Sequence, residues 1–300
     1  MPFRLDRLAT LYIVSPLTRR ADNEIAVPIL MYHSISDDNE SRAHPYFRTT
    51  TTPDVFATHM AYLHANCYKT CSVPQAVDYV RGRSETTAKH VVITFDDGFR
   101  DFYHQAFPIL DRHGFTATVF LPTAYIGDVP RQFKGKDCLS WMEVRELNKH
   151  GISFGSHTVN HPQLRDLEAA SVRQEIVNSK QRIEDKAGCS VTSFAYPYAF
   201  PQADQAFVAQ LKDALMSAGY TDGVCTVVGT ATRQSDTFFL QRLPINSCDD
   251  LPLFRAKLNG GYDWLSRPQH ALKVAKKWLT PSVCSRRAGM ADTNALSADR

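Results

Sequence analysis

The sequence predicts an α/β protein built on a parallel sheet, because short apolar segments alternate with amphipathic ones along most of the chain. A strand that is covered on both faces reads as an unbroken apolar run, and residues 91–95 are the clearest case. Glycine follows three of the predicted helices, as Gly114, Gly151 and Gly219, and glycine commonly ends helices. This alternation indicates either a βα barrel or a doubly wound sheet.

Each predicted element follows from its own local pattern. Short apolar runs predict strands at residues 27–32, 91–95, 116–121, 152–155 and 192–196. Apolar residues at helical spacing predict helices at residues 53–65, 101–113, 141–150, 167–186 and 204–218. We expect a single domain at residues 27–280, with an N-terminal extension at 1–26 and a disordered tail at 281–300. Both ends are expected to be loosely held.

The composition excludes several classes of protein. With 300 residues, 43% of them hydrophobic and 22% charged, the chain is too apolar to be disordered and long enough to bury a core without disulfides. Its 34 basic and 31 acidic residues leave a net charge of +3, which argues against a nucleic-acid partner. No phosphate-binding glycine motif follows any predicted strand, which argues against nucleotide binding.

The cysteines and the apolar runs bear on location. The seven cysteines are scattered and form no C-x-x-C pair, so we interpret them as buried thiols in a reducing compartment. No run approaches the roughly 20 apolar residues of a membrane span. The N-terminal residues lack a clear signal peptide. We therefore expect no membrane span and a cytoplasmic protein.

Two polar clusters follow predicted strands. Asp96 and Asp97 come directly after the strand at 91–95, and His157 and His161 follow the strand at 152–155. Ligands of α/β proteins bind at the carboxyl ends of parallel strands. One aspartate could instead cap a helix while the other is solvated, and a histidine pair is more often structural than ligating. Two such clusters at the same predicted edge favour a functional site.

One carboxylate and two imidazoles make a metal site with open positions, as in catalytic zinc proteins. The second aspartate would then be available to take a proton. A phosphatase that uses the aspartates with Mg²⁺ is a weaker interpretation, because that ion prefers oxygen ligands and leaves the histidines unused.

These motifs resemble those of the polysaccharide deacetylase (NodB homology) family, which is related to carbohydrate esterase family 4. The resemblance rests on T-F-D-D-G-F at 94–99, S-H-T-V-N-H at 156–161 and F-A-Y-P-Y at 194–198. The segment V-P-I-L-M-Y-H at 27–33 is similar to the subgroup whose last barrel strand has moved to the N-terminus, as in poly-N-acetylglucosamine deacetylases. The resemblance implies a distorted (β/α)7 barrel.

The resemblance also implies roles for single residues. The implied metal ligands are Asp97, His157 and His161, and the implied general base and general acid are Asp96 and His33. The backbone N–H of Tyr198 is the implied oxyanion donor, and the implied substrate-binding residues are Pro197 and Tyr198. The implied cofactor is one divalent ion, zinc first, with cobalt, nickel or iron as alternatives.

The chain departs from the family pattern at Ala195, where many members have an arginine that orients the base. Arg242 could replace that arginine, or it could anchor its own strand. No match exists to the acidic motif that positions the acid histidine, and Asp222 and Asp263 are conceivable substitutes, although each fits a turn or cap equally well.

The expected function is deacetylation of N-acetylglucosamine-type sugars in a glycan or exopolysaccharide precursor, with release of acetate. The alternative is a weak or inactive carbohydrate-binding pseudoenzyme of the same fold. Trp141 is a candidate for stacking on sugar rings, as is Trp264. Residues 128–137, which include Arg131, Lys134 and Lys136, are interpreted as a solvated loop.

Overall fold

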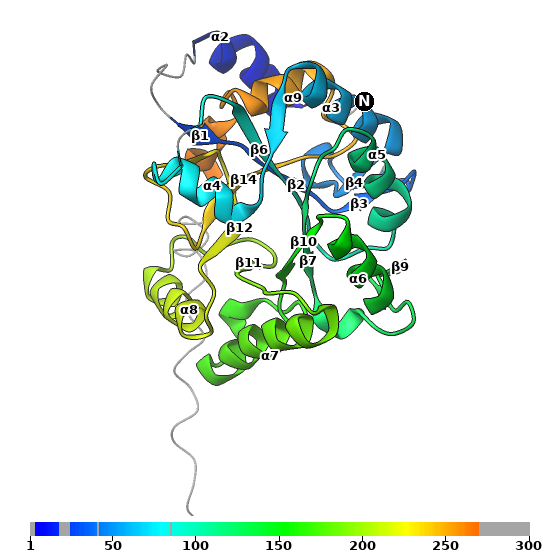
Figure 1. Cartoon of the computed structure of the whole chain (residues 1–300). Helices are drawn as coiled ribbons and strands as arrows, with labels where there is room; N and C mark the ends of the chain where they lie inside the picture. The colour runs from blue at the N-terminus through cyan, green and yellow to red at the C-terminus, as the bar shows by residue number, and fades with distance from the viewer. Residues whose placement is uncertain (1–3, 18–24, 41, 85, 270–300) are drawn as a thin grey trace, which may run out of the picture.

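A computed structural model describes residues 4–17, 25–40, 42–84 and 86–269. In these residues seven parallel strands form a closed barrel with helices around it (Figure 1). Closure comes from β2, which pairs with β14 on one side and with β6 on the other. The strands, in the order in which they neighbour one another, are β2 (Ile29–Tyr32), β14 (Leu240–Pro244), β12 (Asp222–Val228), β11 (Ser193–Ala195), β10 (Ser153–Ser156), β7 (Thr118–Leu121) and β6 (Lys89–Phe95). The barrel prediction is confirmed, and the doubly wound sheet is excluded.

Helices lie outside the barrel and bury their apolar faces against it. They are α3 (Pro53–Ala65), α4 (Val73–Val80), α5 (Phe107–Arg112), α6 (Trp141–Lys149), α7 (Ala169–Ala187), α8 (Gln205–Ser217) and α9 (Leu251–Leu258). Local sequence fixes their ends. Ser140 and Glu143 form a reciprocal capping box at the start of α6, and Gly188 ends α7 with a φ of 69°.

The helix expected at 101–113 divides into a π-helical turn, η3 (Phe102–Ala106), and α5. Pro108 explains the division, because its nitrogen cannot donate a hydrogen bond and its ring would crowd the preceding turn of a regular helix. No element was predicted from the sequence for the segments of β12, α4 and α9. The signal was present in α4, where the buried residues Val73, Ala76, Val77 and Val80 recur at helical spacing.

Short elements decorate the barrel. Strand β5 (Tyr68–Thr70) extends the sheet beyond β6. Three strand pairs are β1 (Ala26–Val27) with β13 (Ala231–Thr232), β3 (Ser34–Ile35) with β4 (Thr50–Thr51), and β8 (Gln132–Phe133) with β9 (Lys136–Asp137). Short 3₁₀ turns are η2 (Pro45–Phe47), η4 (Thr123–Tyr125), η5 (Leu164–Asp166) and η6 (Asp263–Leu265).

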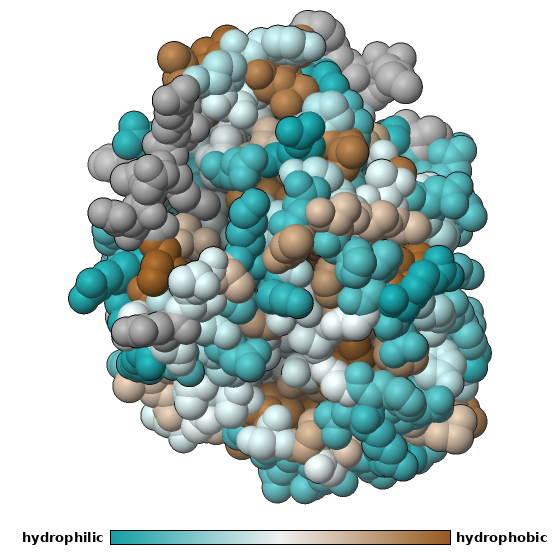
Figure 2. All heavy atoms as spheres, turned by 45° about the horizontal axis from the view of Figure 1, so that its top comes forward, coloured by the Kyte–Doolittle hydropathy of each residue, from teal (hydrophilic) through white to brown (hydrophobic). Residues whose placement is uncertain are grey.

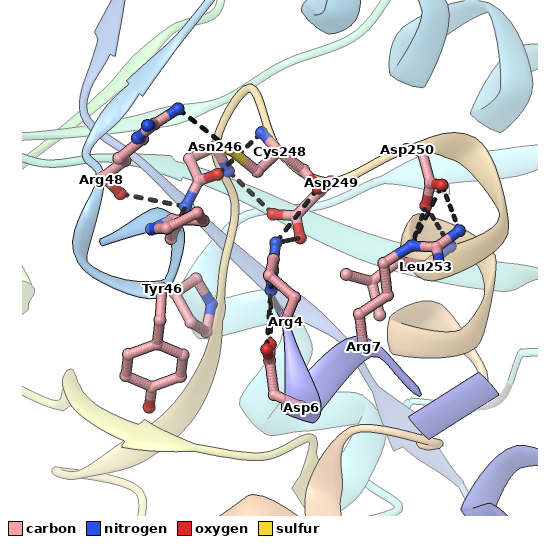
Figure 3. Close-up of polar contacts among 12 residues, drawn as sticks. Arg4, Asp6, Arg7, Tyr46, Arg48, Asn246, Cys248, Asp249, Asp250 and Leu253 are labelled. Atoms are coloured by element: carbon pink, nitrogen blue, oxygen red, sulfur yellow. Dashed lines mark hydrogen bonds and ion pairs between the residues drawn. The ribbon is translucent and has the colours of Figure 1, made fainter. Parts of the chain in front are cut away.

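The N-terminal residues form a helix that is held by charge pairs, as Figure 3 shows. It comprises α1 (Leu5–Ala9), η1 (Thr10–Val14) and α2 (Ser15–Leu17). Arg4 donates to the carbonyl of Cys248 at 3.1 Å, and Arg7 pairs with Asp250. The expectation of a loosely held N-terminus is therefore wrong for residues 4–17. The partners lie some 240 residues away in sequence, so no local pattern could indicate them. The tail expected at 281–300 lies outside the described residues.

The face of the molecule that Figure 2 shows is largely hydrophilic, with apolar atoms in small separate patches. Among the described residues no helix combines the length and the apolar character that crossing a membrane requires.

Asp222 begins β12, so it lies at the opposite end of the barrel from the strand ends that carry His33 and Asp96. It is 1% exposed and accepts a hydrogen bond from Thr221 at 2.8 Å. Burial raises its pKa to about 6. Asp222 is therefore a buried structural acid and not a partner of His33.

We expect Asp222→Asn to stabilise the protein at pH 8 but not at pH 4. A carboxyl whose pKa is higher in the folded than in the unfolded state favours folding at low pH, and that contribution is lost as the pH rises through about 6. The difference in unfolding free energy between variant and wild type should change by about 2–3 kcal/mol across this range. Urea denaturation measures it, with the exposed Asp213→Asn as control. A pH-independent difference would contradict this account.

Candidate metal centre

The carboxyl ends of three barrel strands bring the predicted site residues together. His33 follows β2, Asp96 and Asp97 follow β6, and His157 follows β10. These strands run parallel, so their ends meet at the same edge of the barrel. His161 joins them from the loop after β10. The expectation that the two polar clusters converge is confirmed.

The backbone around the site is strained. Asp97, Thr158, His161 and Tyr198 have φ values of 69°, 70°, 54° and 57°, in the left-handed region that non-glycine residues rarely adopt. The hydroxyl of Thr158 accepts a hydrogen bond from the backbone N–H of His161 at 2.9 Å and so braces the loop. Strain of this kind collects where side chains must be aimed at a common point.

Three buried side chains offer ligand atoms to one point. The potential ligand atoms of Asp97, His157 and His161 all lie within 4.8 Å of one another. The Nε2 atoms of His161 and His157 are 3.2 Å and 3.7 Å from Asp97 Oδ1. His157 Nδ1 lies 2.8 Å from the carbonyl of Ala195, to which it donates, so Nε2 keeps its lone pair for a metal.

The chemistry of this group fits a divalent cation. Asp97 Oδ1 is buried and, among the described residues, accepts no hydrogen bond. Leaving such an oxygen unpaired is unfavourable, and a cation would satisfy it. Burial lowers the pKa of His157 to about 4, so its imidazole is neutral at neutral pH, as metal ligation requires. A carboxylate with two imidazoles suits zinc, cobalt, nickel or iron.

Arg242 holds Asp96 with two parallel hydrogen bonds. Its Nη1 and Nη2 donate to Asp96 Oδ1 and Oδ2, each at 2.7 Å, and both side chains are buried. The same guanidinium donates to the carbonyl of Cys225 at 3.1 Å and to the hydroxyl of Thr94 at 3.2 Å. Arg242 thus orients Asp96 and also ties β14 to β12 and β6, so both sequence hypotheses hold.

This pair decides the ionisation of Asp96. Burial alone would raise the pKa of Asp96, but the adjacent charge and hydrogen bonds of Arg242 outweigh it and lower that pKa to about 2. Asp96 is therefore a carboxylate throughout the neutral range.

His33 faces Asp96 across the site. Its Nε2 lies 4.0 Å from Asp96 Oδ2, and its side chain keeps 19% exposure. Burial lowers the pKa of His33, although the nearby carboxylates oppose that effect. The ring therefore lies beside Asp96 and is partly open to solvent.

Tyr198 lies at the mouth of the site. Its side chain is 46% exposed, and its ring contacts the ring of His161 with centroids 4.5 Å apart. Pro197 is buried, so the structure does not support its prediction as a substrate contact. Trp141 is 1% exposed and lies in the core at the start of α6, so the prediction that it stacks on sugars is wrong. Trp264 donates to Thr10 of the N-terminal helix.

The sequence did not reveal the role of Lys134. Its Nζ lies 3.0 Å from Asp97 Oδ2, so the solvated-loop interpretation is wrong for this residue. Lys134 and Gly135 both have positive φ and form the two-residue turn of the β8–β9 hairpin. Gly135 was the one sequence feature that could have indicated this turn.

A pocket of about 510 Å³ lies between the β8–β9 hairpin and the segment after Asp97, and none of Asp96, Asp97, His157 or His161 lines it. Its wall contains Ile35, Asp101 and Gly135, which come shortly after His33, Asp97 and Lys134 in sequence. The other polar residues of the wall include Ser36, Gln132 and Lys136. Such a lining suits a hydrophilic ligand with many hydroxyl groups.

Comparisons with known proteins agree with this site. The family pattern of polysaccharide deacetylases matches residues 83–221. The Bacillus subtilis protein named "Putative polysaccharide deacetylase YxkH" is 30% identical over 227 residues, which cover 76% of this chain and 74% of that protein. The poly-β-1,6-N-acetyl-D-glucosamine N-deacetylase of Escherichia coli is 31% identical over 141 residues, 44% of this chain but only 20% of that protein.

Solved structures share the fold. The Streptococcus pyogenes deacetylase PplD, solved with acetate, has a TM-score of 0.68 at 25% identity and covers 79% of this chain and 99% of its own. IcaB from Ammonifex degensii has a TM-score of 0.65 at 21% identity, with coverage of 78% and 97%. The chain belongs to the polysaccharide deacetylase family, whose members are hydrolases that remove N-acetyl groups.

We expect Arg242→Met to lower the free energy of unfolding by about 3–5 kcal/mol, because it leaves Asp96 buried without its counter-charge. The double variant Asp96→Asn/Arg242→Met should recover part of this loss, since it removes the unpaired charge. Urea denaturation of the two single variants and the double variant measures the coupling. Strict additivity of the two single effects would mean that Arg242 stabilises the barrel without acting on Asp96.

Proposed function

We propose that this protein is a metal-dependent N-deacetylase that acts on glycans containing N-acetylglucosamine-type sugars and releases acetate. The observation that carries the proposal is the convergence of Asp97, His157 and His161 beside a carboxylate that Arg242 holds in place. The names of the Escherichia coli and Staphylococcus aureus relatives support this substrate class.

Asp97, His157 and His161 would hold the cation, for which zinc is the first candidate. A cation in this position supplies Lewis-acid polarisation of the acetamide carbonyl and of the attacking water. The chain's own residues then handle the protons.

Asp96 takes the proton of the attacking water as the water adds to the amide carbon. Arg242 keeps that carboxylate ionised and fixes the direction of both its oxygens. His33, on the facing side, donates a proton to the departing nitrogen, because an amine leaves poorly as its anion. The backbone N–H of Tyr198 is our candidate for donation to the carbonyl oxygen as it gains negative charge.

The alternative of an inactive carbohydrate-binding protein drew its support from the missing arginine at position 195. Arg242 reaches Asp96 from β14 and supplies the two hydrogen bonds that such an arginine would provide. We therefore propose the active enzyme.

We expect Asp96→Asn to release acetate about 10²–10⁴-fold more slowly, because the asparagine side chain cannot accept the proton of the attacking water. The variant should keep its zinc, because residue 96 is not one of the proposed ligands. Asp97→Ala should lose zinc and activity together. Elemental analysis of the purified variants and an acetate assay on an N-acetylglucosamine oligomer measure both effects, with Asp213→Asn as a surface control. Wild-type turnover by Asp96→Asn would disprove its role as the base.

We also expect kcat/KM to rise with the length of the N-acetylglucosamine oligomer, because further sugar units would contact the exposed ring of Tyr198 at the mouth of the site. Mass spectrometry of oligomers that differ in length and linkage detects each lost acetyl group. Equal efficiency on the monosaccharide and on longer oligomers would argue against a polymeric substrate.

A further inference from the structure

A short hairpin places Lys134 beside the metal centre. Strands β8 and β9 pair antiparallel, and the two-residue turn between them is Lys134–Gly135. Phe133, the residue before the turn, is 8% exposed and packs against the rings of Tyr125 and His161. The base of the hairpin therefore packs against the site and places Lys134 beside Asp97.

Lys134 contacts only one of the two carboxylate oxygens of Asp97, the one that does not face the histidines. Its Nζ is 3.0 Å from Oδ2, whereas Oδ1 faces the two histidines. Its side chain is 45% exposed, so it can move away from Asp97. Its ammonium also lies 4.7 Å and 5.6 Å from the ring centres of Phe133 and Tyr198, which offer favourable cation–π contacts nearby.

We propose that Lys134 is an internal counter-ion of the metal centre, which stabilises Asp97 in the metal-free protein and weakens the binding of a divalent cation. The inference rests on the metal site of the proposed function. Without a cation, Asp97 is a buried carboxylate, and Lys134 supplies the opposite charge that such a group needs.

With a cation bound, two positive charges share one carboxylate. A unit charge about 5 Å from a dication is repelled even at the dielectric constant of water, with a cost equivalent to about tenfold in affinity. Lys134 therefore keeps the site intact when it is empty and sets an upper limit on how tightly it holds its metal.

The same hairpin offers a matched control. Lys136 carries the same charge two residues later, but its Nζ donates to Ser34 at 2.6 Å and pairs with Asp38. Among the described residues, its hydrogen bonds and its ion pair go to Ser34, Ser36 and Asp38, and not to Asp97, His157 or His161. Replacing Lys136 by Met removes one positive charge from the same hairpin, as Lys134→Met does, but it removes no contact with the proposed metal ligands.

The experiment compares Lys134→Met, Lys134→Arg and Lys136→Met with wild type in the full chain. Each protein is stripped with a chelator, and zinc affinity is measured by competition with a chromogenic chelator. Thermal unfolding is recorded with and without zinc. For Lys134→Met we expect zinc to bind about tenfold tighter or more. We also expect a lower Tm without zinc and a larger rise in Tm on adding zinc.

Lys134→Arg and Lys136→Met should bind zinc with wild-type affinity, and adding zinc should raise their Tm as much as it raises that of wild type. Zinc affinity that is unchanged or weaker in Lys134→Met would overturn the proposal, as would an equal gain in Lys136→Met. Lys134→Gln provides a second neutral variant if Lys134→Met does not fold. Failure of the wild-type protein to bind zinc, cobalt or nickel would instead refute the metal centre itself.

Discussion

The ion pair between Arg242 and Asp96 is the interaction on which the rest of the site depends. It joins β14 to β6 inside the barrel, on either side of β2, which carries His33. Desolvating two charges is unfavourable, and a buried pair of this kind adds little stability compared with apolar residues of similar volume. Its value here is geometric, because a bidentate pair fixes both oxygens of the carboxylate. Burial of the two charges is unfavourable, but it fixes the direction of the Asp96 side chain.

Closure of the barrel supplies the second constraint. The N-terminal strand β2 completes the ring between β14 and β6, and this placement brings His33 opposite Asp96 although 62 residues separate the two strand ends. The left-handed backbone at Asp97, His161 and Tyr198 then turns side chains from different loops toward one point. Charge balance completes the site, with Arg242 opposite Asp96 and Lys134 opposite Asp97.

Much of this could be predicted from sequence because it depends on local patterns. An apolar run predicted the strand before Asp96. The position of His157 and His161 just after another predicted strand indicated that they belong to the same site. Contacts between distant segments were not readable in the same way. Arg4 finds its partners near residue 248, and Lys134 reaches Asp97 from a hairpin whose short strands carry no periodicity. Trp141 misled because its aromatic ring suits a sugar surface and a buried core equally well, and only burial decides between them.

The central claim is that Asp97, His157 and His161 meet around a single ion. A crystal structure of the zinc-loaded protein, with anomalous data collected on both sides of the zinc absorption edge, tests it directly. The account predicts one anomalous peak bonded to Asp97 Oδ1 and to the Nε2 atoms of both histidines, at about 2.0–2.2 Å from each. A peak elsewhere, or none with zinc present in excess, would contradict it.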